Sequence, residues 1–226
     1  MEDRPTEETP RVDPAPTGMP PRSKSLVERA KDILIQPKAE WPVIDAEPAT
    51  IGGIYTSYVV ILAAIGPLAM LIGQQLVGIT VLGVTYKPAI GYSVGTAVLT
   101  YILSLVAVYV SALVIDALAP SFGGAKDQVK AFKVAAYSAT AGWVAGIFNI
   151  IPMLGFLALI GALYGLYLLY LGLPRLMRVS EDKAVGYTVV VVVVQIVLYL
   201  VIGMIVGALV ASFFGLGAMT GGVVRY

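Results

Sequence analysis

The chain has 226 residues and a formal net charge of +1, with 58% hydrophobic and only 13% charged residues. This balance is typical of integral membrane proteins, and it leaves no basic surface for nucleic acid. The chain has neither cysteine nor histidine, which excludes disulfides, thiolate chemistry and the commonest general base and metal ligand. The composition therefore favours a membrane protein without a cofactor and without enzymatic activity.

The N-terminal segment differs in composition from the rest of the chain. Residues 1–50 hold 17 of the 29 charged residues, and residues 1–24 contain six prolines. Such a segment buries too little apolar surface to offset the loss of chain entropy, so we predict a disordered cytoplasmic tail over residues 1–24. It lacks the cationic start and apolar core of a cleaved signal peptide, so the first apolar span is expected to act as an uncleaved anchor.

A short amphipathic helix is predicted over residues 25–40. Ser25 and Glu28 have the spacing of a capping box, and apolar residues then recur at helical spacing until Pro37, which ends the element. Two compatible interpretations are equally favoured: the helix lies on the membrane surface, or it packs against the membrane domain. Trp41, just beyond, is expected at the membrane interface.

Five apolar stretches follow within residues 41–214, each long enough to cross a hydrocarbon core of about 30 Å as a helix. They cover residues 53–77, 91–118, 131–151, 154–174 and 187–214. Gly66-Pro67 predicts a kink in the first stretch. The predicted fold class is an all-α membrane protein, a bundle of five transmembrane helices preceded by the amphipathic helix and the disordered tail. Residues 215–226 form a short C-terminal tail.

The basic residues predict the orientation of these five spans. Thirteen Lys and Arg fall on one side of the membrane, whereas only Lys87 and Arg225 fall on the other. Because Lys and Arg in short flanking segments stay in the cytoplasm, we expect the N-terminus inside and the C-terminus outside.

Asp116 is the only acidic residue within a predicted span, near the cytoplasmic end of the second. A carboxylate at the bilayer centre costs about 2.5–3.5 kcal/mol on insertion scales, so an end position is cheaper. The favoured interpretation is a helix-end anchor paired with Lys126 or Lys130 across the following turn. The alternative is a proton or ion ligand, although no second acid accompanies it.

Two further patterns lie within the spans. Tyr164, Tyr167 and Tyr170 recur at every third residue, and we favour a packing surface with hydrogen-bonded hydroxyls over a polar path. Glycines four residues apart let helix backbones approach closely, and contacts within one chain are favoured over self-association. These pairs are Gly91/Gly95, Gly142/Gly146, Gly161/Gly165 and Gly203/Gly207.

The segment that joins the second and third spans carries a recognisable pattern. It comprises Asp116-Ala-Leu-Ala-Pro120-Ser-Phe-Gly123-Gly124, Lys126, Ala131-Phe-Lys133-Val-Ala-Ala-Tyr137-Ser138 and Thr140. Further matches are Ile33-Leu34-x-x-Pro37-x-x-x-Trp41, Pro152-x-x-Gly155, the run from Tyr164-Gly165-x-Tyr167 to Gly172-Leu173, and Lys183-Ala184. Together these motifs resemble the signature of the Yip family, membrane proteins named for interacting with Ypt/Rab GTPases, over about residues 26–210.

The resemblance marks a set of residues for which a structural role is expected. They are Asp116, Pro120, Gly123, Gly124, Lys126, Tyr137, Thr140, Pro152, Tyr164 and Tyr167. Pro120 and Gly123-Gly124 are expected to end the second span in a sharp turn. Family members often have Thr-Pro where this chain has Thr140-Ala141, which puts in doubt only a kink in the third span.

Two functions remain as hypotheses. Eukaryotic members of the family are implicated in vesicle traffic, whereas the lean loops here are more similar to prokaryotic members, which implies a prokaryotic inner membrane. The favoured hypothesis is a non-enzymatic protein that organises membrane or recruits partners; its partners are the lipid bilayer and other membrane proteins or itself. The alternative is a small transporter or channel with Asp116, Gln195 and the tyrosines lining a path. Convergence of those side chains on one cavity would distinguish the two.

Overall fold

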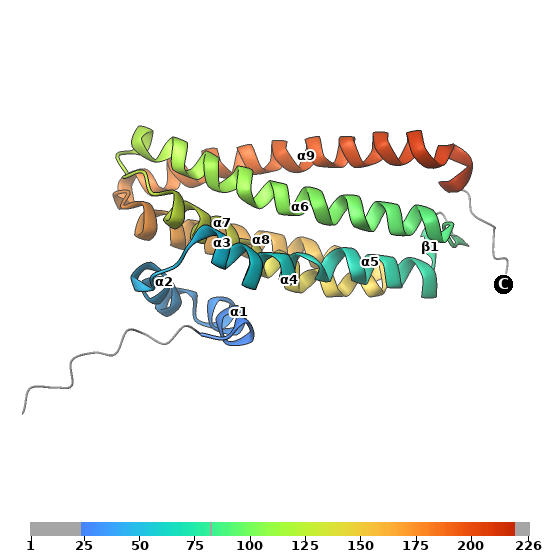
Figure 1. The fold of residues 1–226 in the computed structure, drawn as a ribbon, viewed down its shortest axis with the longest axis horizontal. Coiled ribbons are helices and arrows are strands. Elements are labelled where there is room, and N and C mark those ends of the chain that lie inside the picture. The colour runs from blue at the N-terminus through green and yellow to red at the C-terminus, as the bar shows by residue number, and fades with distance from the viewer. Residues whose placement is uncertain (1–23, 82, 220–226) are drawn as a thin grey trace, which may run out of the picture.

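The structure is a computed structural model that describes residues 24–219 except residue 82. Helices make up almost all of its architecture (Figure 1). The predicted N-terminal tail lies outside the described residues, apart from Lys24. At the other end of the chain, the first residues of the predicted C-terminal tail belong to the last helix, α9 (Glu181–Met219).

The chain enters the fold through two short helices, α1 (Leu26–Ile35) and α2 (Pro37–Ala46), here called the N-terminal hairpin. The capping box is confirmed, because the Ser25 hydroxyl accepts the Glu28 N–H and the Glu28 carboxylate accepts the Ser25 N–H. α1 ends before Pro37 as predicted. A single helix over residues 25–40 is wrong in extent, because Pro37 opens α2 at a position where no N–H is needed.

The first span is a series of short helical segments. They are α3 (Ile51–Ile54), the π-helix η1 (Tyr55–Val59), α4 (Val60–Ala63) and α5 (Ile65–Leu76). The break between α4 and α5 accompanies Gly66-Pro67, since Pro67 has no N–H to donate to the carbonyl of Ala63. The π-helix was not predicted, because no residue type signals an inserted residue in a helix.

A small β-hairpin, which was also not predicted, precedes the second span. Strands β1 (Ile79–Val81) and β2 (Val84–Tyr86) pair antiparallel with Ile79 opposite Tyr86. The long helix α6 (Ile90–Leu118) follows and continues into the 3-10 turn η2 (Ala119–Phe122). Gly123 closes that turn with a positive φ of 75°, which gives the sharp end expected from Pro120 and Gly123-Gly124.

The remaining helices complete the bundle. They are α7 (Gln128–Ala145), the 3-10 turns η3 (Gly146–Ile150) and η4 (Pro152–Leu154), α8 (Phe156–Met177) and α9. α7 is the buried centre of the bundle: its side chains Ala131, Phe132, Val134, Ala136 and Thr140 are completely inaccessible to solvent.

Four described helical stretches are long and apolar enough to cross a membrane. They are Ile51–Leu76, Ile90–Phe122, Pro152–Met177 and Asp182–Leu209. The predicted third span, residues 131–151, corresponds to α7 and η3 and does not reach this threshold. The physical reason is its surroundings: α7 packs against protein on most sides, so its sequence need not be lipophilic.

We call the end of the bundle beside the N-terminal hairpin the proximal end, and the opposite end, which carries the β-hairpin, the distal end (Figure 1). At the proximal end, the N–H of Ala125, just before α7, donates to the carbonyl of Met177 at 3.0 Å, and Tyr187 of α9 bonds the carbonyl of Ile115 of α6. At the distal end, the last turns of α5 lie against η3, beside the β-hairpin (Figure 1). α7 therefore runs the length of the bundle, antiparallel to α6 and α8.

Glycines allow several of these close approaches. A Cβ at Gly161 would lie 2.3 Å from the Cβ of Ala145, and one at Gly146 would lie 2.8 Å from the Cα of Gly66. Packing within the chain is thus confirmed for these positions. Gly203 and Gly207 differ, because a Cβ there would meet nothing within 4 Å.

Candidate functional site

A buried ion-pair network holds the N-terminal hairpin together. Arg29 of α1 is only 4% exposed and pairs with the carboxylates of Glu40 in α2 and Glu47 just after it. Arg29 lies one helical turn before the fully buried Ile33, so both belong to the inward face of α1. The pairing satisfies a guanidinium that would otherwise be too costly to bury.

Lys24 extends this network at the protein surface. Its ammonium lies 2.6 Å from Glu40 and 2.7 Å from Asp32. The hydrogen bond from Lys24 lowers the pKa of Asp32, and the bonds to Asp32 and Glu40 raise the pKa of Lys24. Glu40 therefore accepts from two cations, one buried and one near the surface.

Lys133 of α7 attaches the hairpin to the bundle. It is 4% exposed, and its ammonium donates to the backbone carbonyls of Ile44 at 2.6 Å and Glu47 at 2.5 Å. One turn earlier in α7, Lys130 pairs with Asp45 at 2.7 Å. Two lysines of the central helix thus hold the C-terminal end of α2.

Aromatic side chains fill the space behind these charges. The ring of Tyr137 lies 5.7 Å from the guanidinium carbon of Arg29 and packs edge-on against Tyr58, with ring centres 4.9 Å apart. The Tyr58 hydroxyl forms a 2.8 Å hydrogen bond with Thr140. On α8, the Tyr164 hydroxyl donates to the carbonyl of Leu34 at 2.7 Å. These contacts join α1, the first span, α7 and α8.

Trp41 packs α2 against α8. It is 2% exposed, and its ring lies so close to Gly172 that a Cβ there would come within 2.7 Å of it. The indole is therefore packed between helices, and its N–H is buried without an acceptor among the described residues. The expected position at the membrane interface stays a prediction.

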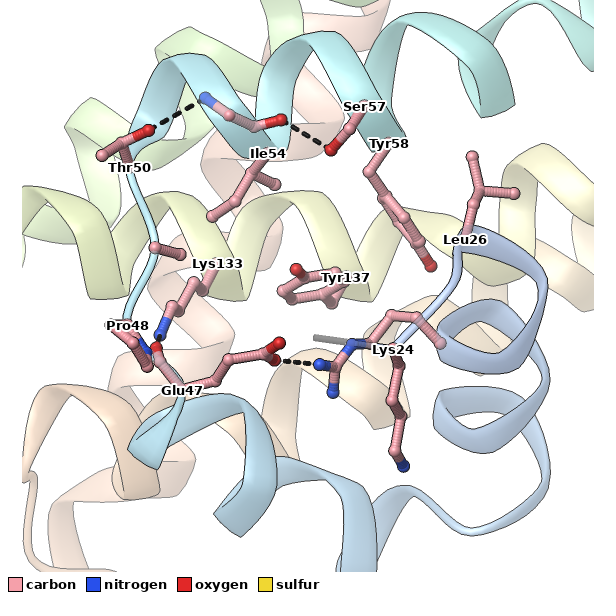
Figure 2. A pocket seen from close by; sticks show the side chains of 13 residues that line it. Lys24, Leu26, Glu47, Pro48, Thr50, Ile54, Ser57, Tyr58, Lys133 and Tyr137 are labelled. Carbon is pink, nitrogen blue, oxygen red and sulfur yellow. Dashed lines mark hydrogen bonds and ion pairs between the residues drawn. The ribbon is translucent and has the colours of Figure 1, made fainter. Parts of the chain in front are cut away.

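A cavity of about 330 Å³ opens between the hairpin, the first span and α7 (Figure 2). We call it the proximal cavity. It is lined by Lys24, Leu26, Arg29, Glu47, Pro48, Ala49, Thr50, Gly53, Ile54, Ser57, Tyr58, Lys133 and Tyr137. Ser57 and Tyr58 belong to the π-helix η1, whose wider turn forms one wall. The lining therefore includes two buried cations from different helices, Arg29 of α1 and Lys133 of α7.

The motif residues around the second span lie elsewhere. Asp116 is buried and accepts the backbone N–H of Asp127 at 2.8 Å. Its expected pairing with Lys126 or Lys130 is wrong: Lys130 pairs with Asp45, and Lys126 is exposed without an ion pair among the described residues. The carboxylate instead secures the turn before α7.

The other motif residues are dispersed. Gly124 packs against the carbonyl of Met177, and Pro152 opens η4 at the distal end. Tyr167 is 40% exposed and contacts only the ring of Tyr164 among its aromatic neighbours, at 5.6 Å. Of the ten motif residues, only Tyr137 lines the proximal cavity.

Several central residues were not singled out as candidate site residues, although Lys133 stands within the quoted motif. They are Arg29, Glu40, Glu47, Tyr58 and Lys133. A signal was present for two of them: Arg29 stands four residues before Ile33 on the apolar face, and Lys133 stands within an apolar stretch. A charge in either position requires a buried partner.

The chain resembles known proteins over most of its length. The model of the Yip1 domain matches residues 31–203. Two relatives, both named inner membrane protein YohC, come from Escherichia coli strain K12 and from E. coli O6:H1 strain CFT073. Each is 29% identical over 156 residues, which cover 67% of this chain and 80% of the relative. No solved structure matches the chain.

Proposed function

This chain belongs to the Yip1 domain family, as its motifs predicted, and on that premise we propose that it is a non-enzymatic scaffold of a prokaryotic inner membrane. It recruits partners or organises membrane through the proximal end of its bundle. The observation that carries this proposal is the N-terminal hairpin, which buried charges hold rigidly against the bundle.

The proposed topology has five crossings with the proximal end in the cytoplasm. α7 and η3 form the additional crossing, because they run from the proximal to the distal end between two helices that are themselves long enough to span. An 18-residue helix is about 27 Å long, and η3 adds the remainder of a hydrocarbon core. The distribution of Lys and Arg supports this orientation.

The proximal end presents basic residues without acidic partners among the described residues. Lys126, Arg175, Arg178 and Lys183 are exposed there. Exposed basic side chains of this kind attract acidic protein segments or anionic membrane surfaces. We therefore place the contact with partners on this surface.

The geometry favours a scaffold over a transporter. A path would bring Asp116, Gln195 and Tyr167 to one cavity, but none of them lines the proximal cavity. Asp116 already accepts the backbone N–H of Asp127. The residues of the alternative path therefore do not meet in this cavity.

The absence of cysteine makes a direct test of the topology straightforward. Single cysteines at Lys126 and at Met153, which is 87% exposed at the distal end, flank α7 on its two sides. In spheroplasts, a membrane-impermeant maleimide should label Met153→Cys at once and Lys126→Cys only after permeabilisation. Equal labelling of both would mean that α7 does not cross.

The recruiting role is tested with a photo-crosslinking amino acid at Arg178, matched by one at Met153. Native membranes should give protein adducts from position 178 and none, or lipid adducts only, from position 153. Adducts from position 153 alone would place the partner surface at the wrong end and contradict the proposal.

A further inference from the structure

The proximal cavity has the composition of a binding site, and we propose that it binds the phosphate-bearing headgroup of a membrane phospholipid. The inference goes beyond the scaffold role, since it requires only that the first span enters the membrane beside the cavity. It rests on the donors that line the cavity, on its position and on the backbone geometry of its wall.

The cavity walls supply unused hydrogen-bond donors. The Lys133 ammonium has three N–H groups, of which two are bonded to the carbonyls of Ile44 and Glu47, so one has no protein acceptor among the described residues. Among the described residues no carboxylate lies within ion-pair distance of Lys133, so an anion in the cavity could pair with its ammonium directly. The Tyr137 hydroxyl likewise has no hydrogen bond to a described residue.

Other polar groups complete the lining. Lys24 and Arg29, which also pair with carboxylates, bring further N–H donors to the lining. Thr50 and Ser57 belong to the wall formed by the start of the first span, where the Thr50 hydroxyl accepts the Gly53 N–H and the Ser57 hydroxyl donates to the Gly53 carbonyl (Figure 2). The one acid in the lining, Glu47, is already paired with Arg29. Lysine, arginine and hydroxyl donors that converge on a small volume are the groups that recognise phosphate.

The position of the cavity indicates that its occupant comes from the membrane. Thr50 directly precedes the first membrane helix, Ile51–Leu76, and Gly53, Ile54, Ser57 and Tyr58 belong to its first two turns. The cavity therefore lies at the depth where phospholipid headgroups lie. Leu26, which is partly exposed, gives the lining an apolar side chain beside which acyl chains can continue into the bilayer.

The backbone of the wall is adapted to the cavity. η1 is a π-helix, a form that is rare and occurs frequently at functional sites. Its extra residue widens the first span where Ser57 and Tyr58 line the cavity.

The test uses the full chain in detergent and measures adducts by native mass spectrometry. The probes are dioctanoyl phosphatidylglycerol, dioctanoyl phosphatidylethanolamine, dioctanoylglycerol and inorganic phosphate. We expect one phospholipid to be retained per chain, with at least tenfold weaker binding of dioctanoylglycerol and of inorganic phosphate. Equal retention of dioctanoylglycerol would show that phosphate is not recognised. Binding of inorganic phosphate as tight as that of lipid would show a soluble anion site and overturn the lipid assignment.

Matched variants on α7 locate the site. Lys133→Gln should weaken phospholipid binding at least tenfold, whereas Lys130→Gln, which removes an ion pair outside the cavity, should change it less than twofold. If thermal melting shows that Lys133→Gln is unfolded, Tyr137→Phe removes the cavity hydroxyl that has no hydrogen bond to a described residue and should weaken binding about threefold. Ser57→Ala is its control, because the Ser57 hydroxyl already donates to the Gly53 carbonyl, and it should change binding less than twofold. Unchanged binding in a folded Lys133→Gln, or in Tyr137→Phe, would overturn the proposal.

Discussion

Lys133 donates a 2.5 Å hydrogen bond to the backbone carbonyl of Glu47, a residue whose carboxylate pairs with Arg29. Glu47 directly follows α2. Its backbone carbonyl thus accepts from Lys133 of the central helix, and its carboxylate pairs with Arg29 of α1. The two contacts fix the exit of the N-terminal hairpin relative to α7. The hairpin consequently packs against the membrane domain, as one of the two compatible interpretations predicted, whereas its position on the membrane surface stays a prediction.

Removal of the Arg29 charge should be strongly destabilising. Arg29→Leu leaves Glu40 and Glu47 as buried carboxylates with one cation fewer, and breaking a buried pair costs about 3–5 kcal/mol. Denaturation in mixed detergent micelles measures this loss, with Lys38→Ala, an exposed residue of α2, as the control. A loss below about 1 kcal/mol for Arg29→Leu would mean that the network does not hold the hairpin.

Glycine substitutions should separate packed from unpacked helix faces. Gly161→Ala places a Cβ 2.3 Å from the Cβ of Ala145, and overpacking of this kind costs about 1–3 kcal/mol. Gly203→Ala meets nothing within 4 Å, so the same change there should be neutral or slightly stabilising. Thermal unfolding of the two variants side by side gives the comparison. Similar melting temperatures would disagree with the packing of α7 on α8.

The hydrogen bond between Tyr58 and Thr140 couples the first span to α7. Tyr58→Phe and Thr140→Val each remove one partner of the 2.8 Å bond. A double-mutant cycle should give a coupling of about 0.5–1.5 kcal/mol in the free energy of unfolding, since both groups are buried. Additive effects of the two substitutions would show that the bond contributes nothing.

Asp116 should tolerate an amide better than truncation. In Asp116→Asn the amide oxygen can still accept the Asp127 N–H, so a loss of about 1 kcal/mol or less is expected. Asp116→Ala removes the acceptor altogether and should cost about 1–3 kcal/mol. Chemical denaturation distinguishes the two, and an equal loss in both variants would point to the charge rather than the hydrogen bond.

The contact of Lys24 with Asp32 should depend on pH. The pKa of Asp32 is lowered by the bond from Lys24, so its contribution to stability is complete above the ordinary carboxyl pKa of 3.8 and disappears as the pH falls through the lower, folded value. Asp32→Asn should therefore melt below the unsubstituted protein at pH 6, and the difference should close at strongly acid pH. A difference that persists there would exclude the carboxylate as its cause.

Features that depend on neighbouring residues were predictable from sequence. Ser25 and Glu28 define the start of α1, and Gly123 defines the turn after α6, because both rely on local backbone geometry. The partners of Lys133 were not predictable. Its ammonium donates to backbone carbonyls 86 and 89 residues earlier, and because every residue has a backbone carbonyl, the residue types do not indicate which one accepts. The same holds for Asp116, whose partner is a backbone N–H rather than a lysine.

The third span illustrates a limit of hydropathy. An apolar sequence reports what faces lipid, whereas α7 is surrounded by protein and can carry Lys130, Lys133 and Thr140. Its burial could not be inferred from the stretch itself, because burial depends on where the other helices pack. The family motifs compensated in part: they contain Lys133 and Tyr137, which line the proximal cavity, although not Lys24, Arg29 and Glu47 beside them.

The attachment of the N-terminal hairpin sets the order in which the chain can mature. Leu34 and the Tyr164 that bonds it are 130 residues apart, and at about 5–20 residues per second the ribosome needs roughly 6–26 s to make the intervening chain. Throughout that interval Trp41 has no helix α8 to cover its ring. The segment synthesised first therefore reaches its final place only after the fourth apolar stretch has left the insertion machinery.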